Sequence, residues 1–214
     1  LFPGYKVSGK KLAIGVLSSH GGTNLQTIID SCKSGQIDAE VRVVICNNSK
    51  ATAMERARRE GIPCFHLSSK THIKPDDLDV AITSTLVDHG VELVALAGYM
   101  KKLGHRTLDR YRRRVLNVHP ALLPKFGGQG MYGLRVHQAV LDAGETVSGV
   151  SIHIVDEEYD HGPVVSQFEV PILEDDAPES LAERVLAQEH ILYSETIKDI
   201  ASGKIDLDEL SQMD

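Results

Sequence analysis

The sequence predicts an α/β protein built on a doubly wound, mostly parallel sheet, with an antiparallel C-terminal strand pair and a long C-terminal helix. Two patterns lead to this prediction. Over the first two thirds of the 214 residues, apolar runs of strand length alternate with helix-period segments, as in a parallel sheet with crossover helices. The last third contains two runs that alternate apolar and polar residues, which is typical of antiparallel strands.

The first two thirds contain five strand candidates and three clear helix candidates. The apolar runs cover residues 11–19, 41–47, 62–67, 92–98 and 114–119. The helical segments cover residues 20–35, 51–61 and 75–90. The third of these begins with proline and acidic residues and ends in glycine, which are helix start and stop signals.

In the last third, the pattern predicts a helix over 134–144, followed by two strands over 147–156 and 164–172 that an acidic loop joins. It then predicts an amphipathic helix over 178–203. No repeat or linker interrupts the chain. We therefore expect residues 11–208 to form a single domain with two halves, at about 11–110 and about 111–208. Residues 1–10 lack periodicity and are interpreted as a lead-in segment.

The composition is that of an ordinary soluble globular protein and argues against several other classes. A net charge of −7 disfavours non-specific binding to nucleic acid or anionic membranes. No apolar run approaches the ~20 residues of a membrane helix, so a cytoplasmic location is expected. The cysteines, Cys32, Cys46 and Cys64, are dispersed and suggest neither disulfides nor a zinc site. The basic stretch 106–114 is interpreted as a solvated helix face.

In an open parallel sheet, ligands bind beyond the carboxyl ends of the strands, where the strand order reverses. This rule selects the segments SSHGGTN, AGYMKK and HPALLPKFGG, which follow the first, fourth and fifth strands. The first segment joins a strand to a helix through two glycines, a typical anion site. It lacks the dinucleotide and P-loop patterns, so a phosphomonoester is the better hypothesis. The alternative is a tight turn with Thr23 as a helix cap.

Asn117 and His119 lie two residues apart at the end of the fifth strand, so their side chains share one face. An amide N–H can stabilise an oxyanion, and an imidazole can move protons near neutral pH. Neither residue is a nucleophile, which favours direct acyl transfer between two bound substrates over a covalent intermediate. The alternative is that both side chains only satisfy loop carbonyls.

A histidine in this role needs a carboxylate that fixes its tautomer and favours its charged form. The acidic loop offers Asp156, Glu157, Glu158 and Asp160. Asp160 is favoured because the sequence HGP follows it and constrains the turn. The alternative is that all four acids form a solvated hairpin tip.

Several motifs in order resemble the phosphoribosylglycinamide formyltransferases, or glycinamide ribonucleotide transformylases, of folate-dependent purine biosynthesis. They are LSSHGGTNLQ, VICN, ERAR, LAGYMK, LNVHPALLPKF, DEEYDHGPV and RVLAQEH, and the likeness runs from about Lys11 to Asp208. The resemblance implies a Rossmann-like formyltransferase fold. It also implies transfer of a formyl group from 10-formyltetrahydrofolate, as co-substrate, to the amine of glycinamide ribonucleotide, without a metal.

By position, the resemblance assigns catalysis to Asn117, His119 and Asp160. The amide and the protonated imidazole would hold the tetrahedral oxyanion, and the carboxylate would raise the imidazole pKa and carry a proton through water. The ribonucleotide would contact Gly22, Thr23, Asn24 and Glu189. The folate would contact Tyr99, Met100, Lys101, Leu103 and Val155.

The chain departs from the family pattern in three places. Lys101 stands where the family often has Arg, which keeps the charge but loses a bidentate contact. The segment 127–136 is longer than the family's loop, which leaves the positions of Lys125, Gln129 and Tyr132 open. Residues 70–77 align poorly, so a carboxylate-binding role for Lys74 also stays open.

Three alternatives remain. The related formyltetrahydrofolate hydrolases and methionyl-tRNA formyltransferases carry an N-terminal or a C-terminal extra domain, and neither extension is expected here. A nucleotide-binding module without catalysis is the alternative from a different class. The expected partners are small-molecule substrates, with no nucleic acid and no membrane, and the protein is expected to be a monomer or homodimer.

Overall fold

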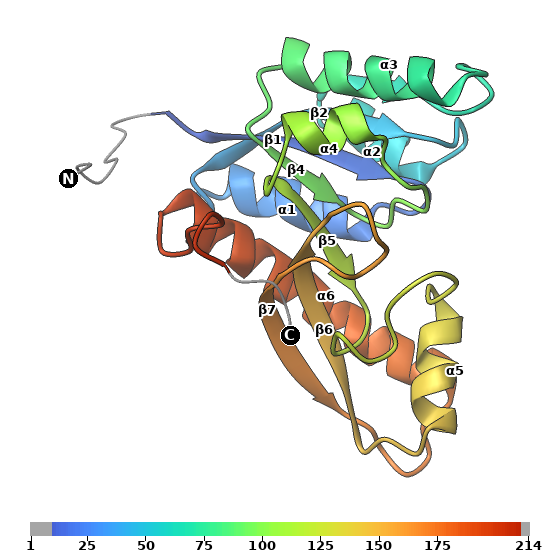
Figure 1. Ribbon diagram of the computed structural model, residues 1–214. Helices are drawn as coiled ribbons and strands as arrows, with labels where there is room; N and C mark the ends of the chain where they lie inside the picture. Colours follow the sequence, from blue (N-terminus) through green and yellow to red (C-terminus); the bar gives the residue numbers. More distant parts are fainter. Residues whose placement is uncertain (1–9, 211–214) are drawn as a thin grey trace.

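The computed structural model describes residues 10–210, so the expected lead-in segment, apart from Lys10, lies outside the described residues. Helices and strands alternate along the chain except at the last two strands, which are consecutive, as predicted (Figure 1). The strands are β1 (Leu12–Ser18), β2 (Ala39–Cys46), β3 (Cys64–His66), β4 (Leu93–Leu96), β5 (Val115–His119), β6 (Val147–Ile154) and β7 (Val164–Pro171). The helices are α1 (Thr23–Lys33), α2 (Thr52–Arg59), α3 (Pro75–Asp88), α4 (His105–Arg110), α5 (Leu134–Asp142) and α6 (Pro178–Ala201).

The strands form one sheet in the order β3-β2-β1-β4-β5-β6-β7. The pairs from β3 through β5 are parallel, whereas β5–β6 and β6–β7 are antiparallel. This confirms the predicted fold class. The buried β1 pairs with β2 on one side and β4 on the other, which explains its almost wholly apolar sequence.

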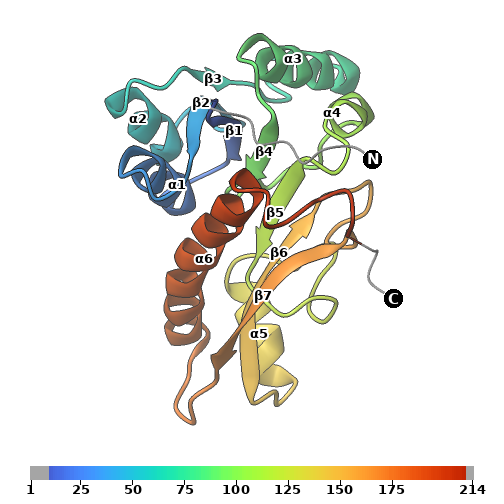
Figure 2. The same ribbon diagram turned by 90° about the vertical axis from the view of Figure 1, so that its left-hand side faces the viewer.

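Helices cover both faces of the sheet (Figure 2). On one face α1, α2, α5 and α6 pack through residues such as Ile28, Met54, Val140 and Val185 into the larger core cluster. On the other face α3 contributes Ile82 and Leu86 to a second cluster, against which Leu108 of α4 also packs. The core is therefore divided into two layers by the sheet.

The strand order reverses between β1 and β4, since the chain passes from β1 outward to β3 and then returns to β4. Two hydrogen bonds join the segments that follow these strands. The N–H of Ser19 donates to the carbonyl of Gly98 at 3.0 Å, and the N–H of Met100 donates to Ser19 Oγ at 2.8 Å. These hydrogen bonds therefore hold the two segments together at the base of the crevice at this switch point.

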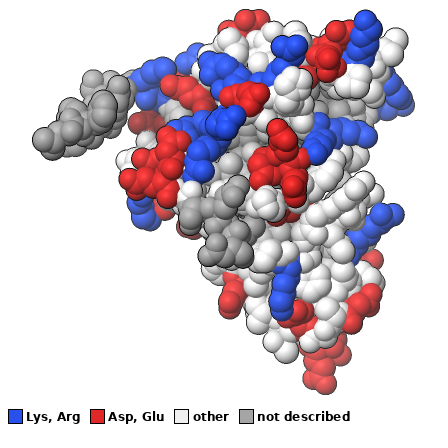
Figure 3. All heavy atoms as spheres, viewed as in Figure 1, with Lys and Arg blue, Asp and Glu red and all other residues white. Residues whose placement is uncertain are grey.

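The surface carries mixed charges. On the face shown in Figure 3, acidic and basic side chains are interspersed. Among residues 10–210, no helix combines the length and apolar character needed to cross a membrane.

Candidate active site

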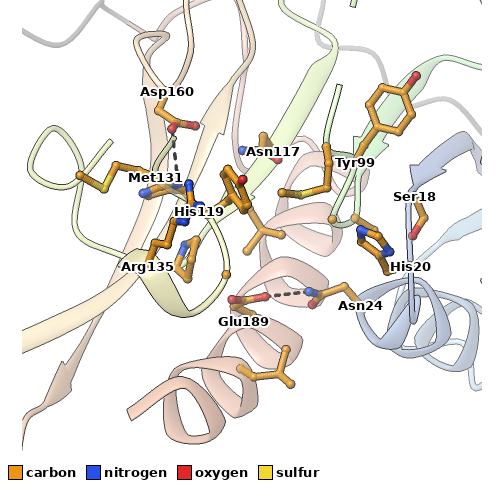
Figure 4. A pocket seen from close by; sticks show the side chains of 18 of the residues that line it. Ser18, His20, Asn24, Tyr99, Asn117, His119, Met131, Arg135, Asp160 and Glu189 are labelled. Carbon is orange, nitrogen blue, oxygen red and sulfur yellow. Dashed lines mark hydrogen bonds and ion pairs between the residues drawn. The ribbon is translucent and has the colours of Figure 1, made fainter. Parts of the chain in front are cut away.

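A cavity of about 1110 Å³ opens at the carboxyl ends of β1, β4 and β5 (Figure 4). All three segments selected from the sequence contribute to its wall. The segment 128–135, the start of α5 and the inner side of α6 complete the lining. The cavity lies where the switch-point rule placed the ligand.

The glycine turn after β1 forms the wall beside α1. Gly22 has a φ of 69° and precedes the helix, and a Cβ there would lie 2.7 Å from Ala53 Cβ, so only glycine fits. No side chain caps α1, and its first turn contains no acidic residue. The alternative in which Thr23 caps the helix is therefore wrong, because Thr23 already lies within α1. The free N–H groups and the helix dipole favour an anion here.

Asn117 and His119 face the cavity from the end of β5, as predicted from their spacing. His119 is buried, and its two ring nitrogens have different neighbours. Nε2 lies 2.8 Å from the carbonyl oxygen of Phe126, and Nδ1 lies 3.5 Å from Asp160 Oδ2. Each nitrogen therefore faces an acceptor, an arrangement that only the doubly protonated ring satisfies completely.

Asp160 reaches this histidine from the loop between β6 and β7. Its φ of 55° places it in the left-handed region, and its Oδ2 accepts a hydrogen bond from the N–H of Gly128 at 2.9 Å. Asp156 instead pairs with the exposed His161 at 3.0 Å. Among the described residues of the acidic loop, Asp160 is the one whose carboxylate contacts His119, as the HGP turn suggested.

Burial and charge act on this pair in opposite directions. Burial lowers the pKa of His119, although the Asp160 carboxylate and the Phe126 carbonyl oppose that shift. For Asp160, burial acts to raise the pKa, but hydrogen bonding with His153, the charge of His119 and the Gly128 N–H outweigh it and hold the pKa below its usual value. Asp160 is thus ionised at neutral pH, and its charge supports the protonated form of His119.

Sequence reasoning missed His153, which lies directly opposite Asn117 in the antiparallel β5–β6 pair. Its Nε2 lies 3.0 Å from Asn117 Nδ2 and 3.4 Å from Asp160 Oδ1. One ring nitrogen therefore contacts both the amide and the carboxylate. The signal was present in VSIHIVD, where Ser151 and His153 are alternate polar residues on one face of a buried strand.

Glu189 enters the cavity from α6. Its Oε2 accepts a hydrogen bond from Asn24 Nδ2 at 2.8 Å, which joins α6 to the glycine turn. Burial raises the pKa of Glu189 to about 7, and the contact with Asn24 opposes this only in part. A hydroxyl-bearing ligand in this position would find a carboxyl group that accepts hydrogen bonds.

The residues expected to contact folate lie in three different places. Tyr99, Met100 and Lys101 line the main cavity. Leu103 is buried in the core cluster of α3, and Val155 borders a separate hollow of about 260 Å³ beside α4. The structure therefore does not bring these last two residues to the main cavity.

The long segment after β5 also contributes to the cavity. Gln129 and Tyr132 line it, whereas Lys125 forms an ion pair with Glu145 at 2.8 Å and stays outside. Further lining residues had no individual role predicted from the sequence, although His20 and Tyr159 lie within quoted motifs: His20, Met131, Arg135, His137 and Tyr159. Within residues 10–210, no group of three or more His, Cys, Asp or Glu side chains is placed to hold a metal ion.

Comparison with known proteins identifies close relatives. The Formyl transferase family model matches residues 12–197. The chloroplastic phosphoribosylglycinamide formyltransferase of Arabidopsis thaliana is 40% identical over 92% of this chain and 67% of that protein. The phosphoribosylglycinamide formyltransferase of Haemophilus influenzae is 39% identical over 96% of this chain and 94% of that protein.

A solved structure gives the same result. Glycinamide ribonucleotide transformylase 1 from Symbiobacterium toebii superposes with a TM-score of 0.87 at 39% identity, covering 97% of this chain and 96% of that chain. The likeness therefore extends over nearly the whole of both chains.

Proposed function

Because the chain belongs to the formyl transferase family and, within it, to the phosphoribosylglycinamide formyltransferases, we propose that it transfers the formyl group of 10-formyltetrahydrofolate to the amine of glycinamide ribonucleotide in purine biosynthesis. The folate is a co-substrate, and no metal takes part.

One observation carries the catalytic part of this proposal. The side chains of Asn117, His119 and Asp160 converge on one wall of a cavity of about 1110 Å³. That volume exceeds the upper end of the usual range for one small-molecule site, and it suits two substrates held together. Proximity then supplies much of the rate acceleration.

In the proposed reaction, the neutral amine of the ribonucleotide attacks the formyl carbon. A C–N bond forms and the carbonyl oxygen gains negative charge, which the Asn117 amide and the His119 Nε2–H stabilise. In the free protein this Nε2–H donates to the Phe126 carbonyl, so the formyl oxygen would replace that acceptor. The bond to the folate nitrogen then breaks, while Asp160, through water, assists the transfer of a proton from the amine to that nitrogen.

The two substrates occupy opposite parts of the cavity in this proposal. The phosphate binds at Gly22, Thr23 and Asn24, and the ribose hydroxyls bind Glu189. The folate lies against Tyr99, Met100 and Lys101. Val155 would contact folate only if the ligand extends from the main cavity toward the hollow beside α4, which Leu103 does not line.

A spectroscopic assay tests the proposed function. The purified protein is mixed with glycinamide ribonucleotide and a 10-formyl folate, and absorbance of the deformylated folate is followed. We expect turnover that requires both substrates. Turnover without the ribonucleotide would instead identify a hydrolase, and no turnover under any condition would favour a binding module.

The remaining expectations accompany this proposal. The protein acts in the cytoplasm as a monomer or homodimer, with small molecules as its partners.

A further inference from the structure

We propose that His20 is a direct ligand of the substrate's phosphate, added to the backbone N–H groups of the glycine turn. This inference rests on the proposed function, because the phosphate is that of glycinamide ribonucleotide. It assigns a phosphate-recognition role to a side chain that lies within the glycine turn but had no predicted role of its own.

The backbone at His20 is fixed on both sides. The preceding residue, Ser19, is tied to the segment after β4 by the two hydrogen bonds described above. The carbonyl of His20 itself accepts a hydrogen bond from the N–H of Ala53 at 3.1 Å. Its side chain lines the cavity together with the next four residues of the chain (Figure 4).

The ring of His20 is exposed to the cavity and has no hydrogen-bond or ion-pair partner among residues 10–210. Both ring nitrogens are therefore available to a ligand. A protonated imidazole donates a charge-assisted hydrogen bond to a phosphomonoester oxygen, and a neutral ring still keeps one N–H donor for it.

A second observation is an unpaired hydroxyl group on the adjoining wall of the cavity. Ser18 lines the cavity beside the uncapped start of α1, and its Oγ is buried with no hydrogen-bond partner in the described part of the chain. An unpaired buried hydroxyl is costly, and a phosphate oxygen would satisfy it. The uncapped N–H groups of α1 point to the same class of ligand.

The charges around the turn also leave a place for a cationic side chain. The chain has a net charge of −7, and the nearby Glu189 adds a carboxyl group to this wall. Arg56 lies behind the turn, where its Nε donates to the carbonyl of Gly21 at 2.9 Å. Arg135 is stacked over Tyr132 at 5.3 Å, on the far side of the cavity (Figure 4). Among the described residues that line the cavity, His20 is the basic residue that lies within the glycine turn between β1 and α1.

The test compares two substrates that differ only in the phosphate. With glycinamide ribonucleotide, we expect His20→Ala to raise KM about tenfold and to leave kcat within about twofold, because one charge-assisted hydrogen bond to a bound group is lost. With the dephosphorylated glycinamide ribonucleoside, parent and variant should have the same KM. His20→Gln keeps a donor and should restore part of the loss.

His105→Ala is the matched control, because His105 is an exposed histidine at the start of α4 and does not line the cavity. It should behave as the parent. Equal losses with both substrates, or an unchanged KM for the ribonucleotide, would overturn the assignment.

Calorimetric titration with the ribonucleotide separates this inference from the proposed function, since it needs no turnover. A parent protein that binds the ribonucleotide about tenfold more tightly than His20→Ala supports the role of His20 even if formyl transfer fails. If the parent and the variant have equal affinity, or if the parent does not bind, the inference is wrong.

Discussion

At the scale of single residues, the proposed chemistry depends on the position of Asp160 beside His119. The imidazole has an acceptor at each ring nitrogen, yet burial disfavours its charged form. The negative charge of Asp160 is therefore what makes a protonated His119 accessible in a buried site.

We expect Asp160→Asn to lower kcat by about 10² to 10⁴-fold while the protein stays folded. Asn tolerates the left-handed conformation at this position, and its amide oxygen can still accept the hydrogen bond from Gly128. The change therefore removes the charge and little else. Steady-state kinetics measures the effect, and Asp175→Asn, at an exposed acid in another loop, serves as the control. Parent-like kcat in Asp160→Asn would show that the proton does not pass through this carboxylate.

The raised pKa of Glu189 predicts that the stability of the protein depends on pH. Burial raises its pKa from 4.5 to about 7 in the folded protein, so the folded state binds more protons than the unfolded state within that range. The free energy of unfolding therefore falls as pH rises from about 4.5 to 7. Above pH 7 the whole of this loss of stability remains, because Glu189 is then ionised in both states.

Glu189→Gln removes this titration. We expect the variant to be more stable than the parent at pH 8, by about 1 to 3 kcal/mol, and similar to it near pH 4.5. Urea unfolding at both pH values measures the difference, while KM for the ribonucleotide should rise because the proposed ribose contact is altered. Equal stability of the two proteins at pH 8 would contradict the raised pKa.

At the scale of elements, the β6–β7 loop determines where the Asp160 carboxylate lies. Gly162 lies against the end of β6, and a Cβ at this position would be 1.9 Å from the carbonyl oxygen of Ile154. The loop therefore cannot keep its path with any larger residue.

We expect Gly162→Ala to lower kcat at least tenfold, because a displacement of about 1 Å in a catalytic group is costly. The clash involves main-chain atoms, so rotation of a side chain cannot relieve it. Kinetics of the variant, together with circular dichroism to confirm folding, makes the measurement. A folded variant with parent-like kcat would show that the loop position is not limiting.

Helix α4 is held by a carboxylate of α3. Buried Asp79 accepts hydrogen bonds from the N–H of Arg106 at 2.8 Å and from the N–H and Oγ1 of Thr107 at 3.2 and 2.5 Å. These contacts cap the start of α4 from another helix, in a place where its own N-cap residue, Gly104, has no side chain.

We expect Asp79→Ala to reduce the free energy of unfolding by about 3 kcal/mol, because it leaves buried donors without an acceptor. Urea unfolding monitored by circular dichroism measures the loss. The control is Asp88→Ala, since Asp88 is exposed at the other end of α3 and accepts no side-chain hydrogen bond among the described residues. Equal effects of the two substitutions would contradict a specific capping role.

At the scale of the whole molecule, α6 connects the two halves that the sequence suggested. It packs against α1 in the first half and against β6 and β7 in the second. The hydroxyl of Tyr193, buried in the middle of α6, lies 3.2 Å from the carbonyl oxygen of Leu96 and 3.1 Å from that of Leu116. We therefore propose that residues 11–208 unfold as a single cooperative domain.

Tyr193→Phe tests this proposal. The variant leaves two buried carbonyl groups without a side-chain donor, so we expect a loss of about 1 to 2 kcal/mol in the free energy of unfolding. Thermal or urea transitions followed by far-UV circular dichroism, and by loss of catalytic activity, should coincide in parent and variant. Two separate transitions would mean that the halves are independent.

The fold and the central residues of the candidate site could be predicted from the sequence for identifiable reasons. Helix and strand periods differ, so Val16 and Ile28 could be assigned to different elements. Asn117 and His119 were predictable as a pair because strand geometry places alternate residues on one face. The sequence did not reveal His153, because its contact with Asn117 depends on the register of two antiparallel strands. Asp79 was missed for the same kind of reason, since its partners are 27 and 28 residues away.

The sequence by itself determined which elements form, because periodicity, glycine turns and proline positions act over a few neighbouring residues. It also determined which side chains stand at the strand ends, since that follows from strand geometry. The sequence favoured Asp160 over Asp156 as the partner of His119, but only the tertiary structure decided that His153 contacts both Asn117 and Asp160, and that Leu103 turns into the core while His20 faces the cavity. The physical reason is that these outcomes depend on loop paths and strand register, which are set by packing between residues distant in the chain.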